Sequence, residues 1–199
     1  SKAFKRVFVH WAAEHFDWPN MGYDELFSVN KVLNEYDFPS LELLHFLLIE
    51  LKLGRHYKGQ FKVTKRGAAM LANPAQLLNT LVPFYIFNID HSAYSRSGEQ
   101  PLGTWDVWLN VLNVEAENAA TEIELYQVFY GPLSDEPMAW RATSAFYSCV
   151  LRPLCWAGVL LEHRDNDARR SEAVYLKTPL WPAWLQLDTD DLVEPAQRH

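Results

Sequence analysis

Few polar side chains in this sequence have the types and spacing that metal binding requires. His10, Glu14 and His15 lie close together on a predicted amphipathic helix. His10 and His15 are five residues apart, which separates them by about 140° around a helix of about 3.6 residues per turn. Histidine pairs that bind a metal from one helix face are typically three or four residues apart. We therefore interpret these histidines as ordinary helix residues.

Nucleophilic catalysis and nucleotide hydrolysis are also disfavoured. Asp90, His91 and Ser92 have the residue types of a hydrolytic triad, but direct neighbours in sequence cannot form the required relay. The sequence has no Gly-x-Ser-x-Gly turn. None of its eight glycines lies in a GxxxxGK[ST] or GxGxxG phosphate-binding pattern. We expect a protein that is not an enzyme and that uses no cofactor or metal ion.

The two cysteines point to a reducing compartment. Cys149 and Cys155 are six residues apart in an apolar segment, a spacing that suits neither zinc nor a redox pair. They are predicted to be buried, reduced thiols. The sequence shows neither a run of about 18 apolar residues nor a signal-peptide pattern at its start. We expect a cytoplasmic protein without a membrane span.

Positive charge is concentrated in one stretch of the chain. Residues 51–89 contain no Asp or Glu, and their six Lys and Arg residues give +6. Since the chain totals -7, the remainder carries -13. A positive patch on an acidic body orients charged partners. The six basic residues are Lys52, Arg55, Lys58, Lys62, Lys65 and Arg66.

The sequence predicts that the first half of the chain forms helices around a short hairpin. Apolar residues recur at steps of three and four where helices are expected, and they alternate with polar residues around a Lys-Gly turn where the hairpin is expected. Pro39 disfavours helix in the residue before it, and Gly54 is a usual helix terminator. The predicted helices run from Phe4 to Phe16, Leu26 to Tyr36, Leu41 to Leu53, Thr64 to Leu71 and Gln76 to Ile89, with the hairpin from Arg55 to Val63.

The order of elements begins again after a polar segment, His91 to Pro101, that is rich in turn formers. We place the boundary there, which gives domains 1–90 and 91–199. The second domain should begin with a helix that has one apolar face (Trp105, Trp108, Leu109, Leu112), followed by a capping box (Thr121, Glu124) ahead of a helix from Leu125 to Tyr130. A helix from Met138 to Leu161 should be kinked or divided at Pro153. A longer hairpin around Glu162 to Glu172 and a final helix in Thr178 to Leu185 should complete the domain.

Both domains end in similar segments. Residues 61–71 and 175–185 each contain a strand, a threonine and a helix that ends in leucine, at a period of 114 residues, which suggests a duplicated domain. The first copy, Thr64-Lys65-Arg66-Gly67, resembles the end of bacterial winged helix-turn-helix domains, in which a threonine hydroxyl caps a helix. The second copy has Trp181 in place of the glycine, so it is read as a degenerate copy. The resemblance implies a mostly α fold with small β-hairpin wings, arranged as two winged-helix-like domains in tandem.

The resemblance makes DNA binding the leading hypothesis. In such domains the third helix enters the major groove while the wing contacts phosphates. The first domain's wing is basic, but its third helix, with Glu42, His45, Ile49 and Lys52 on its polar face, is poorly suited to phosphates. The second domain's third helix carries a polar stripe at steps of three, four and four, and its wing mixes Arg164, Arg169 and Arg170 with acidic residues. The candidate nucleic-acid-binding residues are Arg55, Lys58, Lys62, Lys65, Arg66, Arg141, Ser144, Ser148 and Arg152.

We therefore expect a non-catalytic, DNA-binding transcription regulator whose partner is double-stranded DNA. The alternative is a protein-interaction or adaptor module that binds a protein partner or a second copy of itself, with no nucleic-acid contact. This alternative predicts an exposed apolar patch, for example at Ile49 or in Phe84 to Phe87. A third interpretation is that the stripe and the wing are simply solvated surfaces.

Overall fold

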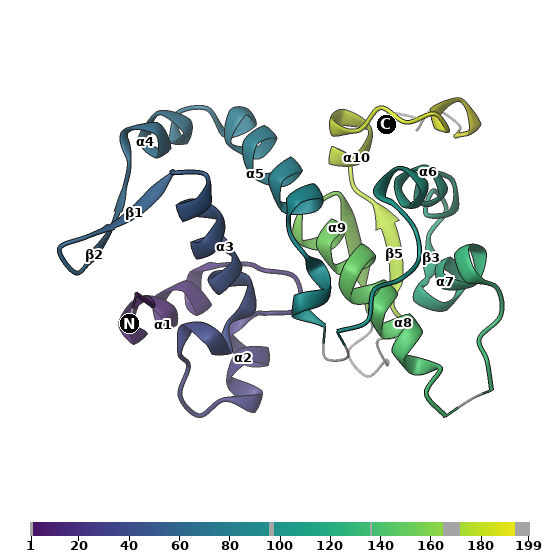
Figure 1. The fold of residues 1–199 in the computed structure, drawn as a ribbon, viewed down its shortest axis with the longest axis horizontal. Helices are drawn as coiled ribbons and strands as arrows, with labels where there is room; N and C mark the ends of the chain where they lie inside the picture. The colour runs from purple at the N-terminus through teal and green to yellow at the C-terminus, as the bar shows by residue number, and fades with distance from the viewer. Residues whose placement is uncertain (1, 96–97, 136, 165–171, 194–199) are drawn as a thin grey trace. The chain divides into compact units, whose positions relative to one another are not determined.

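The computed structural model describes residues 2–95, 98–135, 137–164 and 172–193, and it divides the chain into two compact units, residues 1–85 and 86–199. Both units are mostly helical, and each holds a small antiparallel sheet, of two strands in unit 1 and three in unit 2 (Figure 1). The expectation of a mostly α fold with small hairpins is confirmed. The division between the units falls inside a connecting helix, whereas the turn-rich segment indicated a boundary after residue 90.

Unit 1 contains three α-helices and a 3-10 helix, followed by a hairpin and two further helices. Its core is formed where α1, α2 and α3 meet, around Val9, Leu26 and Leu41. The elements are α1 (Arg6–His15), α2 (Tyr23–Val29), the 3-10 helix η1 (Glu35–Asp37), α3 (Pro39–Glu50), β1 (Gly54–Tyr57), β2 (Gln60–Val63), α4 (Lys65–Leu71) and α5 (Pro74–Asn88), which runs on into unit 2.

The predicted helix from Leu26 to Tyr36 is wrong in its second half, because α2 ends at Val29. The Asn30 side chain donates to the Leu26 carbonyl at 3.1 Å. Asn34 and Asp37 then form a capping box that starts η1. Asparagine side chains bond to nearby backbone groups in competition with the helix, so apolar spacing alone overestimated the helix length.

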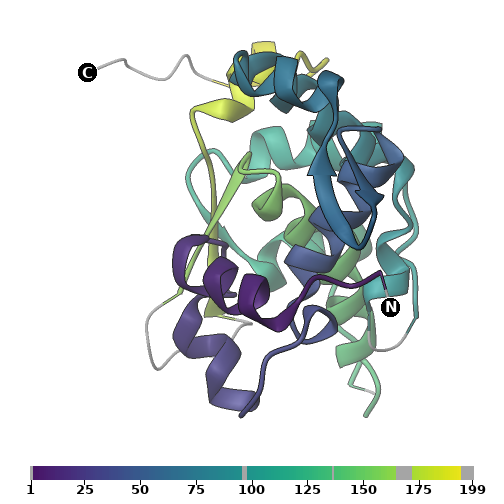
Figure 2. The same cartoon turned by 90° about the vertical axis from the view of Figure 1, so that its left-hand side faces the viewer.

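The hairpin forms as predicted. Its register pairs Arg55 with Lys62 and Tyr57 with Gln60. The two turn residues, Lys58 and Gly59, have φ angles of 48° and 73°, as a type I′ turn requires at both central positions. The strands extend away from α3 in Figure 1, and Figure 2 looks at the hairpin from the side toward which its tip projects.

Thr64 connects both ends of the hairpin to the helices that flank it. Its amide donates to the Leu53 carbonyl at 2.9 Å and its hydroxyl donates to the Lys52 carbonyl at 2.7 Å. The same hydroxyl accepts from the Gly67 amide at 3.1 Å, which caps α4. A Cβ on Gly67 would lie 2.2 Å from the Leu53 carbonyl oxygen, so this close approach requires glycine. Lys52, with φ 57°, takes the left-handed position after α3 that we had assigned to Gly54.

Unit 2 repeats this order with a longer hairpin and an additional strand. Its sheet has the strand order β3-β5-β4, and both pairs are antiparallel. The elements are η2 (His91–Tyr94), α6 (Trp105–Glu115), β3 (Ala120–Thr121), α7 (Glu122–Tyr130), α8 (Trp140–Phe146), the π-helical turn η3 (Tyr147–Leu151), α9 (Arg152–Trp156), β4 (Leu160–His163), β5 (Val174–Lys177), α10 (Leu180–Trp184) and the 3-10 helix η5 (Asp190–Leu192).

Two predictions for unit 2 can be compared directly with these elements. The capping box is confirmed, because the Thr121 amide donates to Glu124 Oε2 at 2.8 Å and the Glu124 amide donates to Thr121 Oγ1 at 3.2 Å. The helix predicted from Met138 to Leu161 is divided close to Pro153, as expected, by the π-helical turn η3, but its bounds are wrong, because it begins at Trp140 and ends at Trp156. Proline cannot donate a helical hydrogen bond and its ring crowds the preceding turn, and the wider turn directly precedes Pro153.

The threonine of the second copy makes the same backbone contacts as that of the first. The Thr178 amide donates to the Val159 carbonyl at 3.0 Å, and its hydroxyl donates to the Gly158 carbonyl at 2.7 Å. Gly158 has φ 78° and corresponds to Lys52 of unit 1. The expected similarity between 61–71 and 175–185 therefore extends to individual hydrogen bonds.

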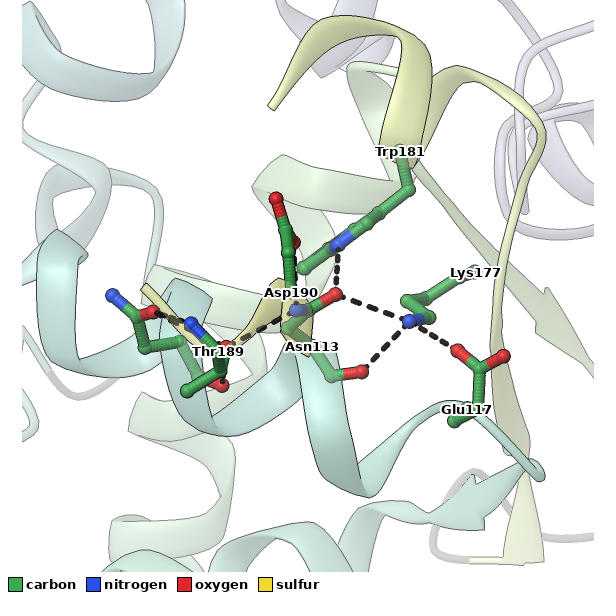
Figure 3. A network of polar contacts seen from close by, with 7 residues as sticks. Asn113, Glu117, Lys177, Trp181, Thr189 and Asp190 are labelled. Atoms are coloured by element: carbon green, nitrogen blue, oxygen red, sulfur yellow. Dashed lines mark hydrogen bonds and ion pairs between the residues drawn. The ribbon is translucent and has the colours of Figure 1, made fainter. Parts of the chain in front are cut away.

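The tryptophan that replaces the glycine is part of unit 2's core. Trp181 is 1% exposed, and its indole Nε1 donates to Asn113 Oδ1 at 2.9 Å. Figure 3 shows Asn113 at the centre of a polar network on α6. Lys177 Nζ donates to the Asn113 carbonyl at 2.7 Å and pairs with Glu117. Asn113 Nδ2 in turn donates to Thr189 Oγ1 at 3.1 Å, so one buried amide holds β5, α10 and the segment after α10.

Substitution of Thr64 tests its role in joining the hairpin to the helices. Thr64→Ala removes the cap of α4 and the hydroxyl bond to Lys52, and should lower the free energy of unfolding by about 1–2 kcal/mol. Thr64→Ser keeps the hydroxyl and should recover most of that loss. Urea denaturation of the three proteins measures the difference. Equal stability of the Ala and Ser variants would contradict the role given to the hydroxyl.

Asn113→Ala tests the network of Figure 3. It leaves the buried Trp181 Nε1 without its acceptor and should cost about 1–3 kcal/mol in thermal or urea unfolding. The matched control is Asn118→Ala, at an exposed position beyond α6, which should change stability by less than about 0.5 kcal/mol. Similar losses in the two variants would show that the network contributes nothing specific.

Candidate nucleic-acid interface

Three predicted site residues gather around one aromatic ring on the hairpin. The Arg55 guanidinium carbon lies 5.5 Å from the Tyr57 ring centroid. The Nζ atoms of Lys58 and Lys62 each lie 5.4 Å from the same centroid. These distances are within the cation–π range of about 6 Å. We call Arg55, Tyr57, Lys58 and Lys62 the basic hairpin cluster.

Strand geometry explains this grouping. Arg55 and Tyr57 are two residues apart on β1, so both side chains project from the same face, and the register places Lys62 directly opposite Arg55. Like charges at such a cross-strand position repel. The negative face of the Tyr57 ring offsets this repulsion. Tyr57 is itself 45% exposed, so the cluster faces solvent.

Lys65 and Arg66 continue the positive surface into the first turn of α4, where both are exposed. Positive side chains at a helix N-terminus interact unfavourably with the helix dipole, so their position does not serve the helix. Within the part of the chain that the structure describes, none of the five basic residues Arg55, Lys58, Lys62, Lys65 and Arg66 forms an ion pair. These cations are available to an external anion.

The exposed face of α3 differs from the one predicted. His45 is buried at 7% exposure and is not on that face. The exposed residues are two acidic and two apolar side chains, Glu42, Phe46, Ile49 and Glu50. Negative charge beside apolar surface is unsuited to a phosphate backbone. This helix is therefore poorly suited to DNA, as the sequence indicated, although its exposed residues differ from those predicted.

The polar stripe of unit 2 is not assembled as an open surface. Arg141 is exposed and pairs with Glu99 at 3.6 Å. Ser144 is half-buried and Ser148 is 5% exposed. Arg152 Nη2 donates to the Tyr94 carbonyl at 3.2 Å, in η2, which packs against η3.

The π-helical turn η3 accounts for this difference, because the predicted steps of three and four hold only for a regular α-helix. The four side chains therefore do not share one exposed face. Arg169 and Arg170 of the same unit's wing lie outside the described residues.

Asp90, His91 and Ser92 form a turn, as the sequence indicated, and not a triad. Asp90 Oδ1 accepts from the Ser92 hydroxyl at 2.6 Å, and this bond, against a smaller opposing effect of burial, lowers the pKa of Asp90. His91 Nε2 lies 3.2 Å from the Ile86 carbonyl oxygen. These residues border an open cavity of about 280 Å³ with Trp105. That is smaller than the roughly 300–1,000 Å³ of typical ligand pockets.

Both cysteines are buried and free, as predicted. Burial raises the pKa of the Cys149 thiol to about 11, so it remains a protonated thiol at neutral pH. Among the described residues, no three His, Cys, Asp or Glu side chains converge as a metal site would require. In the same part of the chain, no helix has the length and apolar character needed to cross a bilayer.

Sequence reasoning missed a buried polar relay behind the basic hairpin cluster, which we call the Glu35–His45–His56 relay. Glu35, at 5% exposure, accepts hydrogen bonds from the Phe4 amide and from His45 Nδ1. His45 Nε2 then lies 2.9 Å from His56 Nε2 on β1. The only sequence signal was that His56 alternates with Arg55 and Tyr57 and must therefore point to the opposite face of the hairpin.

Comparisons with known proteins agree with the division into two parts. A protein of Sinorhizobium fredii, named "Uncharacterized protein y4jL", is 37% identical over 131 residues, which are 65% of this chain and 60% of the relative. The chain thus spans less than two thirds of that relative's length. No solved structure matches. Residues 1–76 match the family described as "Y4jL N-terminal domain" and residues 95–179 match "y4jL C-terminal domain", so most of the chain is similar to the two Y4jL domains, in that order.

Proposed function

We propose that unit 1 is a winged-helix-like domain that binds double-stranded DNA through the basic hairpin cluster, in a non-catalytic, regulatory role. The observation that carries this proposal is the gathering of Arg55, Lys58 and Lys62 around the exposed Tyr57. Affinity for nucleic acid comes largely from Lys and Arg contacts with phosphates. The positive charge of this cluster attracts phosphates and would orient the hairpin toward DNA.

The order of elements supports the winged-helix interpretation. In each unit, three α-helical regions (α1, α2 and α3 in unit 1; α6, α7 and α8 to α9 in unit 2) and one 3-10 helix precede a hairpin. A threonine at the end of the hairpin caps or begins a short helix. In unit 2 the short strand β3 also pairs with β5 of the hairpin. A helix-turn-helix core with a wing has this order of elements, and we propose this architecture for both units.

The charges favour contact through the wing and not through α3. Glu42 and Glu50 on the exposed face of α3 would be repelled by a phosphate backbone, whereas Lys65 and Arg66 extend the hairpin's positive surface. Contacts of this kind position a protein on DNA and carry little sequence information. We therefore propose binding that depends strongly on salt and weakly on sequence.

Fluorescence anisotropy with a mixed-sequence duplex tests this function. If three to five cations contact phosphates, affinity should fall about 40- to 500-fold between roughly 50 and 200 mM salt. The variant with Arg55, Lys58 and Lys62 all changed to Glu should lose nearly all binding. The control changes three other exposed cations, Lys2, Lys31 and Arg164, to Glu, which gives the same net charge, and should keep most of the affinity. Equal losses in the two triple variants would contradict a localised site.

A second candidate function is self-association through α3. Phe46 and Ile49 are 44% and 38% exposed and lie three residues apart on that helix, so their side chains are neighbours on its surface. Exposed apolar residues that are grouped in this way often mark interaction surfaces. The stretch from Phe84 to Phe87 offers less exposed apolar surface, because Tyr85 and Ile86 are buried.

Sedimentation equilibrium tests the second candidate. If α3 mediates self-association, the native protein should form dimers or larger assemblies at micromolar concentration and Phe46→Glu should be a monomer. Val32→Glu, at a position 47% exposed outside α3, is the matched control and should associate like the native protein. A native protein that stays monomeric over the whole concentration range would exclude this function.

A further inference from the structure

Unit 2 has an open cavity of about 280 Å³, which we call the Asp90 cavity. It lies between η2, the segment before α6, the first turns of α6 and η3, and all of its lining residues belong to unit 2. Its lining has two parts with different chemistry. The polar part consists of Asp90, Ser92 and Gln100, and the apolar part contains the indole rings of Trp105 and Trp108.

The polar part is organised around the Asp90 carboxylate. Asp90 Oδ1 accepts from the Ser92 hydroxyl at 2.6 Å, from the Ser92 amide at 3.0 Å and from Gln100 Nε2 at 3.3 Å. The Ser92 hydroxyl bond, which outweighs the opposing effect of burial, lowers the pKa of Asp90, so the group is an anion at neutral pH. Because these three bonds all reach Oδ1, Oδ2 can accept from a ligand.

The charge of Asp90 is not balanced by a neighbouring cation. Within the described ranges of the chain, no Lys, Arg or His side chain forms an ion pair with it. The positive charge of Arg152 acts on Cys149, which lines the cavity. The Arg152 guanidinium, however, donates to the Tyr94 and Ser148 carbonyls at 3.2 and 3.4 Å and does not line the cavity. A ligand in the cavity therefore meets an unpaired carboxylate.

The indole rings are held in place without a ligand. Trp108 is 7% exposed, and its Nε1 donates to the Tyr130 hydroxyl at 3.1 Å. A Cβ on Gly103 would lie 2.6 Å from the same nitrogen, so the backbone at Gly103 packs directly on the ring. Trp105 meets Trp108 edge-on, with centroids 5.4 Å apart, and is partly exposed. A pre-formed wall of this kind reduces the entropy lost on binding.

We propose that the Asp90 cavity binds a small organic ammonium ion, with its charged end at the Asp90 carboxylate and its apolar body against Trp105. A carboxylate forms strong hydrogen bonds with an ammonium group, and an indole is the best aromatic partner for a cation. An anion would be repelled by Asp90, and a neutral ligand would gain the apolar contact alone. Since a water molecule takes up about 30 Å³, the cavity suits a ligand of roughly ten non-hydrogen atoms or fewer. This site is independent of the DNA binding proposed above.

Benzylammonium is a suitable probe, and benzyl alcohol is its neutral counterpart of equal size. In native protein labelled for NMR, benzylammonium at constant ionic strength should shift the backbone amides of residues 89–92 and 100–105 and the indole N–H signals of Trp105 and Trp108. The dissociation constant should be about 10 mM or lower, as a ligand of this size allows. Benzyl alcohol should bind about 3- to 10-fold more weakly, because it lacks the charge.

Asp90→Asn removes the charge and keeps the turn, because an asparagine oxygen can accept the bonds from Ser92 and Gln100. This variant should bind benzylammonium about 3- to 10-fold more weakly than the native protein and should bind benzyl alcohol unchanged. The matched control is Asp188→Asn, at an exposed position of unit 2 outside the cavity lining. It should bind both probes like the native protein.

The test depends on a charge effect that needs both the ligand and Asp90. Tighter binding of benzylammonium than of benzyl alcohol in the native protein, and equal binding in Asp90→Asn, would support the proposal. Equal affinities of the native protein for the two probes, or an unchanged preference for benzylammonium in Asp90→Asn, would overturn it. Shifts spread over both units, or no shifts in residues 89–92 and 100–105, would also overturn it. None of these results bears on DNA binding, so the proposed function stands or falls separately.

Discussion

The arrangement of unit 1 depends on one threonine that bonds in two directions. Thr64 returns the end of β2 to the end of α3 through Lys52 and Leu53, and its hydroxyl also begins α4. The hairpin is therefore closed at its base by the same residue that positions Lys65 and Arg66 beside it. Since the turn at Lys58 and Gly59 fixes the register, both ends of the hairpin are determined locally, and the basic residues gain fixed positions relative to one another.

The two units share these threonine hydrogen bonds but differ in the residues that surround them. In unit 1 the close approach of Gly67 to Leu53 brings α4 against the hairpin base, and the hairpin keeps its cations exposed. In unit 2 the same backbone bonds are kept at Thr178, but Trp181 fills the core and is bonded to Asn113. The polar groups of unit 2's third helix are also turned inward or paired, as Ser148 and Arg152 show. The features that suit nucleic acid are thus concentrated in unit 1.

Local rules predicted the parts of the fold that local hydrogen bonds determine. The Lys58–Gly59 turn, the Thr64 cap and the Thr121–Glu124 capping box were all visible in the sequence, because each involves residues within three or four positions of one another. The length of α2 and the π turn at which the helix divides before Pro153 were not predicted. In the first case asparagine side chains compete with the backbone, and in the second a π turn changes the helical phase. Similarly, the basic residues of the site followed from composition, but their convergence on Tyr57 depends on the strand register, and the burial of His45 depends on Glu35, ten residues earlier.

Mapping of amide chemical shifts during titration with a mixed-sequence duplex tests the central claim most directly, because it locates the contact within the chain. The account predicts that the largest changes fall on residues 54–66, with small changes on the exposed face of α3 around Phe46 and on Arg141 and Ser144 of unit 2. Changes centred on α3 or on unit 2, with residues 54–66 unaffected, would contradict it.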